Sequence, residues 1–238
     1  EAPVRVLAMP HQQVLLPQTL LHNYKHNLIN LKSQKKQINI MENILNVSVI
    51  LPINSFKNRD FDTYFESAIK SLTIQKTTFN ELIIVHTQEE QLVTKLKNYD
   101  FETLNVKLVE YIGEPSFQKQ ISFGVEQSES EWVSFFEFDD EYSNIWFDNV
   151  LKYSEIYPDV DAFLPIVVDV DNKGTFAGFT NEATFAANFT QEMGYLNNET
   201  LLDYQNFQTA GMVIKKEKLV DFGGFKPSIK LTFVYEFL

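Results

Sequence analysis

Short β-branched segments that alternate with amphipathic ones constrain the fold of this chain more than any other feature. The run VSVILPI at residues 47–53 is apolar at nearly every position, as expected for a strand buried on both faces of a sheet. Residues 60–72 instead place their apolar side chains on one helical stripe. Strands that are joined through helices pair in parallel. We therefore predict an α/β fold with a mostly parallel central sheet flanked by helices.

The same alternation continues along the chain. Further strands are expected at 81–85, 106–111, 131–136 and 210–214, and further helices at 89–99, 116–127, 146–157 and 216–224. Two strands at 162–170 and 175–179, joined by a turn that contains Asn172 and Gly174, are expected to form a hairpin. We assign these elements to one domain, residues 46–238.

The first 45 residues differ from the rest. Between residues 15 and 31 the apolar side chains recur at loosely helical spacing, and the basic, polar run SQKKQ follows at 33–37. We expect residues 1–45 to form a helical N-terminal extension or linker, available to dock a partner, a further domain or a membrane-associated assembly.

Composition excludes several classes of partner and site. A net charge of −12 argues against binding to the phosphate backbone of a nucleic acid. The chain has no apolar run of membrane-spanning length, and its N-terminus lacks the basic start and apolar core of a signal peptide. The absence of cysteine excludes disulfides and thiolate chemistry and fits a reducing compartment. We therefore expect a cytoplasmic location and no membrane span.

Clustered carboxylates follow the predicted strand at 131–136. Glu137, Asp139, Asp140 and Glu141 come directly after its apolar residues. Ligands of open α/β sheets bind beyond the carboxyl ends of the strands. Hard divalent cations take carboxylate and phosphate oxygens as ligands. The cluster thus suits a Mg²⁺ or Mn²⁺ site, and a solvated acidic turn is the alternative.

Four segments, in this order, resemble the family 2 glycosyltransferases of GT-A fold. The segments are VSVILPIN at 47–54, ELIIVHT at 81–87, FGVEQSESEWVSFFEFDD at 123–140 and AGMVIKKEKLVDFGGFKP at 210–227. The resemblance covers residues 46 to 238. It implies the GT-A, nucleotide-diphospho-sugar transferase-like fold, with a Rossmann-like nucleotide-binding half and an Asp-x-Asp-like turn. The family pattern continues past the position of Leu238, so we expect the domain to be truncated at its C-terminus.

The resemblance also assigns roles in a donor site. It implies that Asp139 binds Mn²⁺ or Mg²⁺ against the diphosphate of a UDP- or GDP-linked sugar. Glu137 would lie near the ribose or nucleotide, although the family usually has aspartate there. Asp140 would support the turn within the catalytic centre. Pro52, Asn54 and Lys119 fall at further donor-binding positions.

Two positions depart from the family pattern. His86 and Thr87 stand where the family usually has two aspartates, the first of which contacts the nucleobase. His86 either contacts the base through a ring nitrogen or ends the strand without a ligand. Val234 takes the position of the catalytic base, and valine cannot accept a proton. Glu236, two residues on, is the alternative base, and an ordinary exposed glutamate is its other interpretation.

Two further patterns lie between 169 and 195. Residues 169–174 resemble the start of a calcium loop, but Lys173 and Thr180 stand at two ligand positions, so a hairpin turn is the better interpretation. Aromatic residues gather in the polar segment that follows. These rings either contact a sugar acceptor or fill a core beneath a loop; they are Phe176, Phe179, Phe185, Phe189 and Tyr195.

These observations predict a metal-dependent glycosyltransferase. It would move a sugar from a nucleotide-diphosphate donor to an acceptor hydroxyl, on a glycan or another molecule, with inversion at the anomeric carbon. The departures at His86, Thr87 and Val234 favour an alternative. In that alternative, the chain is a catalytically degenerate GT-A-like module that binds a nucleotide or glycan or acts as a scaffold.

Overall fold

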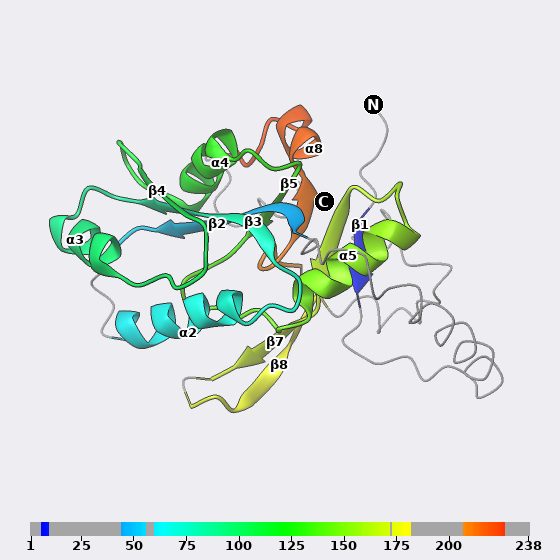
Figure 1. The fold of residues 1–238 in the computed structure, drawn as a ribbon, viewed down its shortest axis with the longest axis horizontal. Helices are drawn as coiled ribbons and strands as arrows, with labels where there is room; N and C mark the ends of the chain where they lie inside the picture. The colour runs from blue at the N-terminus through cyan, green and yellow to red at the C-terminus, as the bar shows by residue number, and fades with distance from the viewer. Residues whose placement is uncertain (1–5, 10–43, 56–59, 172, 182–206, 227–238) are drawn as a thin grey trace, which may run out of the picture.

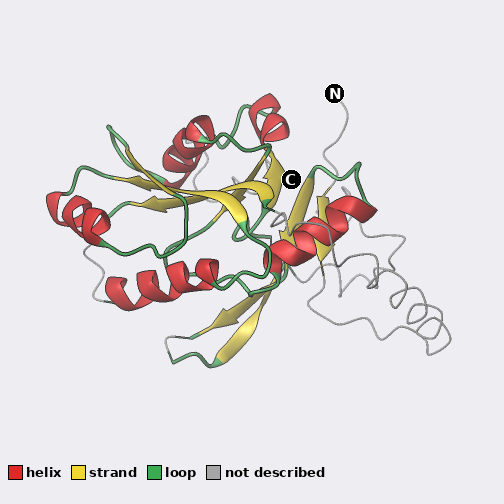
Figure 2. Cartoon of the chain, in the orientation of Figure 1, coloured by secondary structure: helices red, strands yellow, loops and turns green. Residues whose placement is uncertain are grey.

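The computed structural model describes residues 6–9, 44–55, 60–171, 173–181 and 207–226. These residues form a seven-stranded sheet covered by helices on both faces, together with a separate two-stranded hairpin (Figure 1). Figure 2 shows the same arrangement by type of element, with helices on either side of the strands. The α/β architecture predicted from the sequence is confirmed.

Strands and helices alternate through the first half of the domain. The strands are β2 (Leu45–Ile53), β3 (Phe79–His86), β4 (Val106–Glu110) and β5 (Trp132–Phe135). The helices between them are α2 (Phe61–Thr73), α3 (Glu90–Asn98) and α4 (Phe117–Gln127). All seven overlap the elements expected from the sequence. The strands are apolar runs and the helices have apolar residues at helical spacing, so each pattern is visible locally.

The second half is less regular. After α5 (Trp146–Ile156) come the strands β6 (Ala162–Pro165), β7 (Val167–Val170) and β8 (Phe176–Thr180). The strand β9 (Val213–Lys215) leads directly into the short helix α8 (Lys216–Asp221). The large sheet has the order β1-β6-β9-β5-β2-β3-β4. Within it β9 runs antiparallel to β5 and β6, and the other neighbours are parallel.

Each face of the sheet has its own apolar core. On one face, alternate residues of β2 (Val47, Val49 and Leu51) pack with side chains of α2, α3 and α5. On the other face, Ile50 packs with side chains of α4 and α8. Gly124 of α4 lies so close to the sheet that an added Cβ would overlap the side chain of Ile50. Because both faces are covered, the strands read as almost continuous apolar runs.

The prediction of a single strand at 162–170 is wrong, because these residues form two strands. The first part, β6, pairs with β1 and β9 in the large sheet, and β7 pairs only with β8 in the hairpin. The break falls at Ile166, directly after Pro165. Proline has no N–H to donate to a sheet ladder, so it suits the point at which a strand leaves the sheet. The hairpin projects from the body of the domain (Figure 1).

Part of the N-terminal extension is described. Residues Val6–Met9 form strand β1, which pairs in parallel with β6 at the edge of the large sheet. The helix expected at 15–31 lies outside the described residues. In the part of the chain that the structure describes, the helices are too short or too polar to cross a membrane.

Candidate functional site

The carboxyl ends of three neighbouring strands meet at one edge of the sheet. β2 lies between β3 and β5 and is parallel to both. Asn54 therefore follows β2, Thr87 follows β3 and Glu137 lies just past β5, all at the same edge. The Phe136 N–H donates to the carbonyl of Ile50 at 3.0 Å, which keeps the chain beside β2 as it leaves the sheet. This edge is where open α/β sheets bind ligands.

The carboxylate cluster forms a turn at this edge. The backbone N–H of Asp140 donates to the carbonyl of Glu137 at 3.2 Å. Glu137, Asp139 and Glu141 are exposed, and Asp140 is partly buried. The acids predicted from the sequence to share a site therefore do lie together, on one turn.

Crowding of these acids changes their protonation. The pKa of Asp140 is raised to about 6, first by burial and then by the charges of Asp139 and of Asp169 on the hairpin. Glu137 as a whole residue is exposed, but protein surrounds its carboxyl group. This burial raises the pKa of Glu137 to about 7, and the charges of Asp140 and Asp139 contribute further. A divalent cation would relieve this repulsion, and carboxylate oxygens are ligands of the right kind.

The turn does not form a complete metal cage by itself. In the described parts of the chain, no group of three or more acidic or histidine side chains is arranged to hold a metal ion. Mg²⁺ and Mn²⁺ commonly keep only one or two protein carboxylates and take the remaining ligands from phosphates and water. The residues therefore fit a cation that binds together with a phosphate-bearing ligand.

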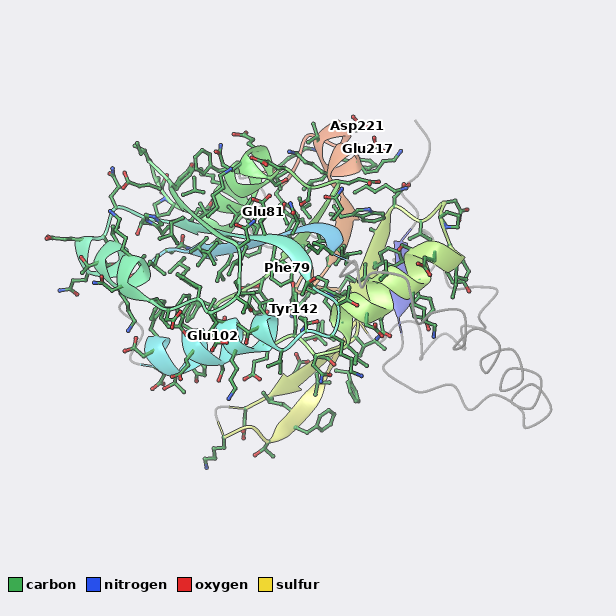
Figure 3. The ribbon with its side chains drawn as sticks, in the orientation of Figure 1. Phe79, Glu81, Glu102, Tyr142, Glu217 and Asp221 are labelled. Atoms are coloured by element: carbon green, nitrogen blue, oxygen red, sulfur yellow. The ribbon has the colours of Figure 1, made fainter. Side chains whose placement is uncertain are left out.

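A buried hydrogen-bond network fixes the turn to the body of the domain. Tyr142 lies near the end of α2 (Figure 3), and its N–H donates to Ser71 Oγ at 3.0 Å. Its hydroxyl donates to the Phe135 carbonyl at 2.9 Å, and burial raises the pKa of this phenol, which stays neutral. The amide of Gln75, two residues past the end of α2, donates to the Ser143 carbonyl at 2.9 Å.

Sequence reasoning missed this network. Ser71 lies in the last turn of α2 and Gln75 lies two residues past its end, and both are buried. A buried polar side chain needs a hydrogen-bond partner. The polar residues Ser71 and Gln75, in and just after an apolar helix, could therefore have indicated such hydrogen bonds. The sequence does not indicate which loop supplies the partners.

The other predicted donor-site residues line the ends of β2 and β3. Pro52 and His86 are buried, and His86 pairs with Ile53 in the sheet. His86 Nδ1 lies 2.9 Å from the carbonyl of Thr87, and a carbonyl can only accept, so Nδ1 carries a proton. The Thr87 hydroxyl donates to the Asn54 carbonyl at 3.0 Å. The structure thus brings Asn54, His86 and Thr87 together.

Helix α4 begins beside this edge. Lys119 lies in its first turn, with Nζ 3.3 Å from the Glu114 carbonyl and 3.6 Å from its carboxylate. The next residue, Gln120, is fully buried and donates to the carbonyls of Val85 at 3.1 Å and Ile53 at 3.4 Å. Gln120 therefore ties the ends of β2 and β3 together, and it is a further residue that the sequence did not single out. Its Oε1 has no hydrogen-bond partner among the described residues.

A cavity of about 470 Å³ opens between the acidic turn and the hairpin. Asp139, Asp140 and Glu141 line one side, and Ile166, Val168 and Val170 line the other. A volume of this order is ordinary for a small-molecule site, roughly 300–1,000 Å³. The cavity therefore has room for a ligand beside Asp139.

Gly211 and Pro165 also line the cavity. Gly211 has a φ of +72°, and an added Cβ would lie 3.0 Å from Pro165 Cγ. Asn181 holds the two segments that carry these residues together, because its amide donates to the carbonyls of Pro165 at 2.9 Å and Gln208 at 3.1 Å.

The remaining predicted site residues are only partly described. Phe176 and Phe179 of β8 are 58% and 46% exposed, so these two rings do not fill a core. Phe185, Phe189, Tyr195 and Glu236 lie outside the described residues. β7 and β8 pair as the hairpin expected in place of a calcium loop, and Asp171, Lys173 and Gly174 lie between these strands. Asp171 there accepts hydrogen bonds from the N–H groups of Lys173 and Thr175.

The fold resembles solved glycosyltransferase structures. The crystal structure of residues 1–349 of TarS from S. aureus matches with a TM-score of 0.56 and 19% identity, over 79% of this chain and 52% of that chain. The same fragment in complex with UDP gives the same values. Its complex with UDP-GlcNAc matches with a TM-score of 0.51 and 21% identity, over 76% of this chain and 48% of that chain.

This likeness confirms the GT-A fold. The chain spans about half the length of the TarS fragment that it resembles. No model of a known protein family matches the chain, and no curated protein matches it in sequence.

Proposed function

We propose that this chain is a glycosyltransferase that uses a nucleotide-diphosphate sugar, linked to UDP or GDP, and passes the sugar to an acceptor hydroxyl. One observation carries the proposal. The turn with Glu137, Asp139 and Asp140 lies at the carboxyl edge of the sheet, beside the ends of β2 and β3, in a GT-A fold. The two TarS complexes with UDP and UDP-GlcNAc support a donor of this class.

Asp139 is the proposed ligand of a divalent cation, Mn²⁺ or Mg²⁺. It is exposed and lines the cavity, as does the neighbouring Asp140. A bound cation would neutralise the negative charge of the departing nucleotide diphosphate. Glu137 is proposed to lie near the ribose, and Asp140 to hold the shape of the turn. At the neighbouring strand ends, Asn54 and His86 are proposed to contact the nucleoside.

The proposed chemistry is a single displacement with inversion at the anomeric carbon. The acceptor oxygen forms a bond to the anomeric carbon as the bond from that carbon to the diphosphate oxygen breaks. A carboxylate must take the proton of the acceptor hydroxyl. Glu236 is proposed for this role, and the cavity beside Asp139 is the proposed place for the acceptor.

A nucleotide-binding module without transferase activity is the second candidate. The Thr87 hydroxyl donates to the Asn54 carbonyl, and His86 Nδ1 contacts the carbonyl of Thr87. Both side chains are thus engaged with the backbone, which favours a weaker or different contact with a nucleobase than the family pattern has.

Calorimetric titration of UDP, GDP and their common sugar conjugates, with and without Mn²⁺, tests the proposal. We expect binding that requires Mn²⁺ and that Asp139→Ala abolishes. Asp221→Asn changes an exposed carboxylate on α8 (Figure 3) and is the matched control, expected to bind like the wild type. A folded wild-type protein that binds no nucleotide in the presence of Mn²⁺ would rule out the transferase.

Donor turnover separates the two candidates. Release of UDP or GDP from a bound sugar nucleotide, in the presence of a suitable acceptor, is expected of the transferase. Metal-dependent binding without any turnover of the donor would instead identify the chain as a binding module.

A further inference from the structure

The hairpin presents an exposed apolar face. In its register Val168 lies opposite Phe179, and Val170 lies opposite Phe176. Residues that pair across two strands share a face, and the irregularity between Asp169 and Val170 lets both rings lie on it. All four side chains are between 46% and 58% exposed. The centroids of the two rings are 4.9 Å apart, and the rings are tilted by 59°.

This face is continuous with the cavity. Val168 and Val170 line the cavity beside Asp139 and Asp140, and each of them pairs across the hairpin with one of the phenylalanines. An extended ligand whose end lies in the cavity would therefore pass over the rings of Phe176 and Phe179. A ligand confined to the cavity would not extend over these rings.

The described lining of the cavity is acidic. Asp139, Asp140 and Glu141 line it, and none of its described lining residues is Lys, Arg or His. Residues 120–151, which include the acidic turn, contain eight Asp or Glu and no Lys, Arg or His. A negatively charged ligand would thus meet repulsion from the turn.

The cavity offers hydrogen-bond acceptors. Ionised carboxylates can only accept, so hydroxyl groups of a ligand can donate to Asp139, Asp140 and Glu141. Trp146 also lines the cavity, but its indole Nε1 is buried, so we assign it no hydrogen bond to a ligand.

We infer that the acceptor is an uncharged oligosaccharide, an inference that rests on the proposed transferase function. Its terminal unit occupies the cavity, where the carboxylates of the turn accept hydrogen bonds from its hydroxyl groups. The preceding unit packs its apolar ring face on Phe176 and Phe179. Acidic glycans, with carboxylate or phosphate groups, are excluded by the charge of the turn.

Binding of the full chain to an array of immobilised glycans tests the inference. The array holds neutral oligosaccharides of one to five units and their carboxylated or phosphorylated counterparts, and the chain is applied with Mn²⁺ and UDP. We expect binding to neutral chains of two or more units. Phe176→Ala and Phe179→Ala should each weaken it roughly three- to tenfold.

Phe222→Ala removes a ring of similar exposure, 41%, from the end of α8 and is the matched control. Nucleotide binding, measured on the same variants, should be unchanged in all three. Raising the salt concentration should reduce the discrimination against acidic glycans, because screening weakens repulsion between charges.

The results separate failure of this inference from failure of the proposed function. Absence of nucleotide binding would overturn both. Nucleotide binding without any glycan bound would overturn the inference alone. The inference alone would also be overturned if acidic and neutral glycans bound equally well. The same conclusion would follow if Phe176→Ala and Phe179→Ala bound glycans as tightly as Phe222→Ala does.

Discussion

Replacing Asp140 with asparagine should stabilise the chain at neutral pH. In the folded protein the pKa of Asp140 is raised from 3.8 to about 6, by burial and by the charges of Asp139 and Asp169. The unfolded chain loses this proton first as the pH rises, so the folded state holds more protons between about pH 4 and pH 6. By linkage, stability falls as the pH rises through that window.

The size of the effect follows from the shift. A difference of about 2 pKa units at about 1.4 kcal/mol per unit amounts to roughly 3 kcal/mol, which is an upper bound because nearby acids titrate together with Asp140. Asparagine keeps the shape of the side chain without the charge. We therefore expect Asp140→Asn to be about 2–3 kcal/mol more stable than the wild type at pH 8, with the difference vanishing toward pH 4.

Urea unfolding followed by circular dichroism, at steps from pH 4.5 to pH 8.5, measures this difference. Asp221→Asn, an exposed carboxylate on α8, is the control and should change stability little at any pH. Mn²⁺ should stabilise the wild type more than Asp140→Asn above pH 6, because the cation offsets the repulsion. The reasoning would be refuted if Asp140→Asn were no more stable than the wild type at pH 8. It would also be refuted if the difference in stability between the two proteins were the same at pH 5 and at pH 8.

Three further substitutions test the packing that positions the site, each by its free energy of unfolding in urea. Gly124→Ala forces a methyl group against Ile50 and should destabilise the domain by roughly 1–3 kcal/mol. Gly211→Ala puts a side chain at positive φ and against Pro165, and should cost about 1–2 kcal/mol and also weaken ligand binding in the cavity. Tyr142→Phe removes the buried hydroxyl and should cost about 1–2 kcal/mol. For each variant, stability equal to the wild type would contradict the stated contact.

The sequence predicts the first half of the fold well because the information there is local. The strands β2 to β5 are short apolar runs, and the helices between them have one apolar stripe each. Parallel pairing follows from the intervening helices. The position of Glu137 and Asp139 at the carboxyl edge of the sheet follows in turn, because they come directly after β5.

The second half depends on contacts that no local pattern contains. The sequence does not indicate that β9 inserts between β5 and β6, or that it runs antiparallel to both. It also does not indicate that β7 leaves the large sheet after Pro165. These features depend on contacts between residues that are far apart in the sequence. The cavity next to Asp139 forms from such contacts, so its shape could not be predicted.

The same contacts explain how a destabilised turn persists. Desolvated carboxylates raise the free energy of the folded state at neutral pH, and a loop of this composition would otherwise move out into water. Hydrogen bonds from Tyr142 to Ser71 and Phe135, and from Gln75 to Ser143, hold the turn in place from the buried side. The turn is therefore held by hydrogen bonds within the protein. The proposed cation would relieve the repulsion without first having to order the loop.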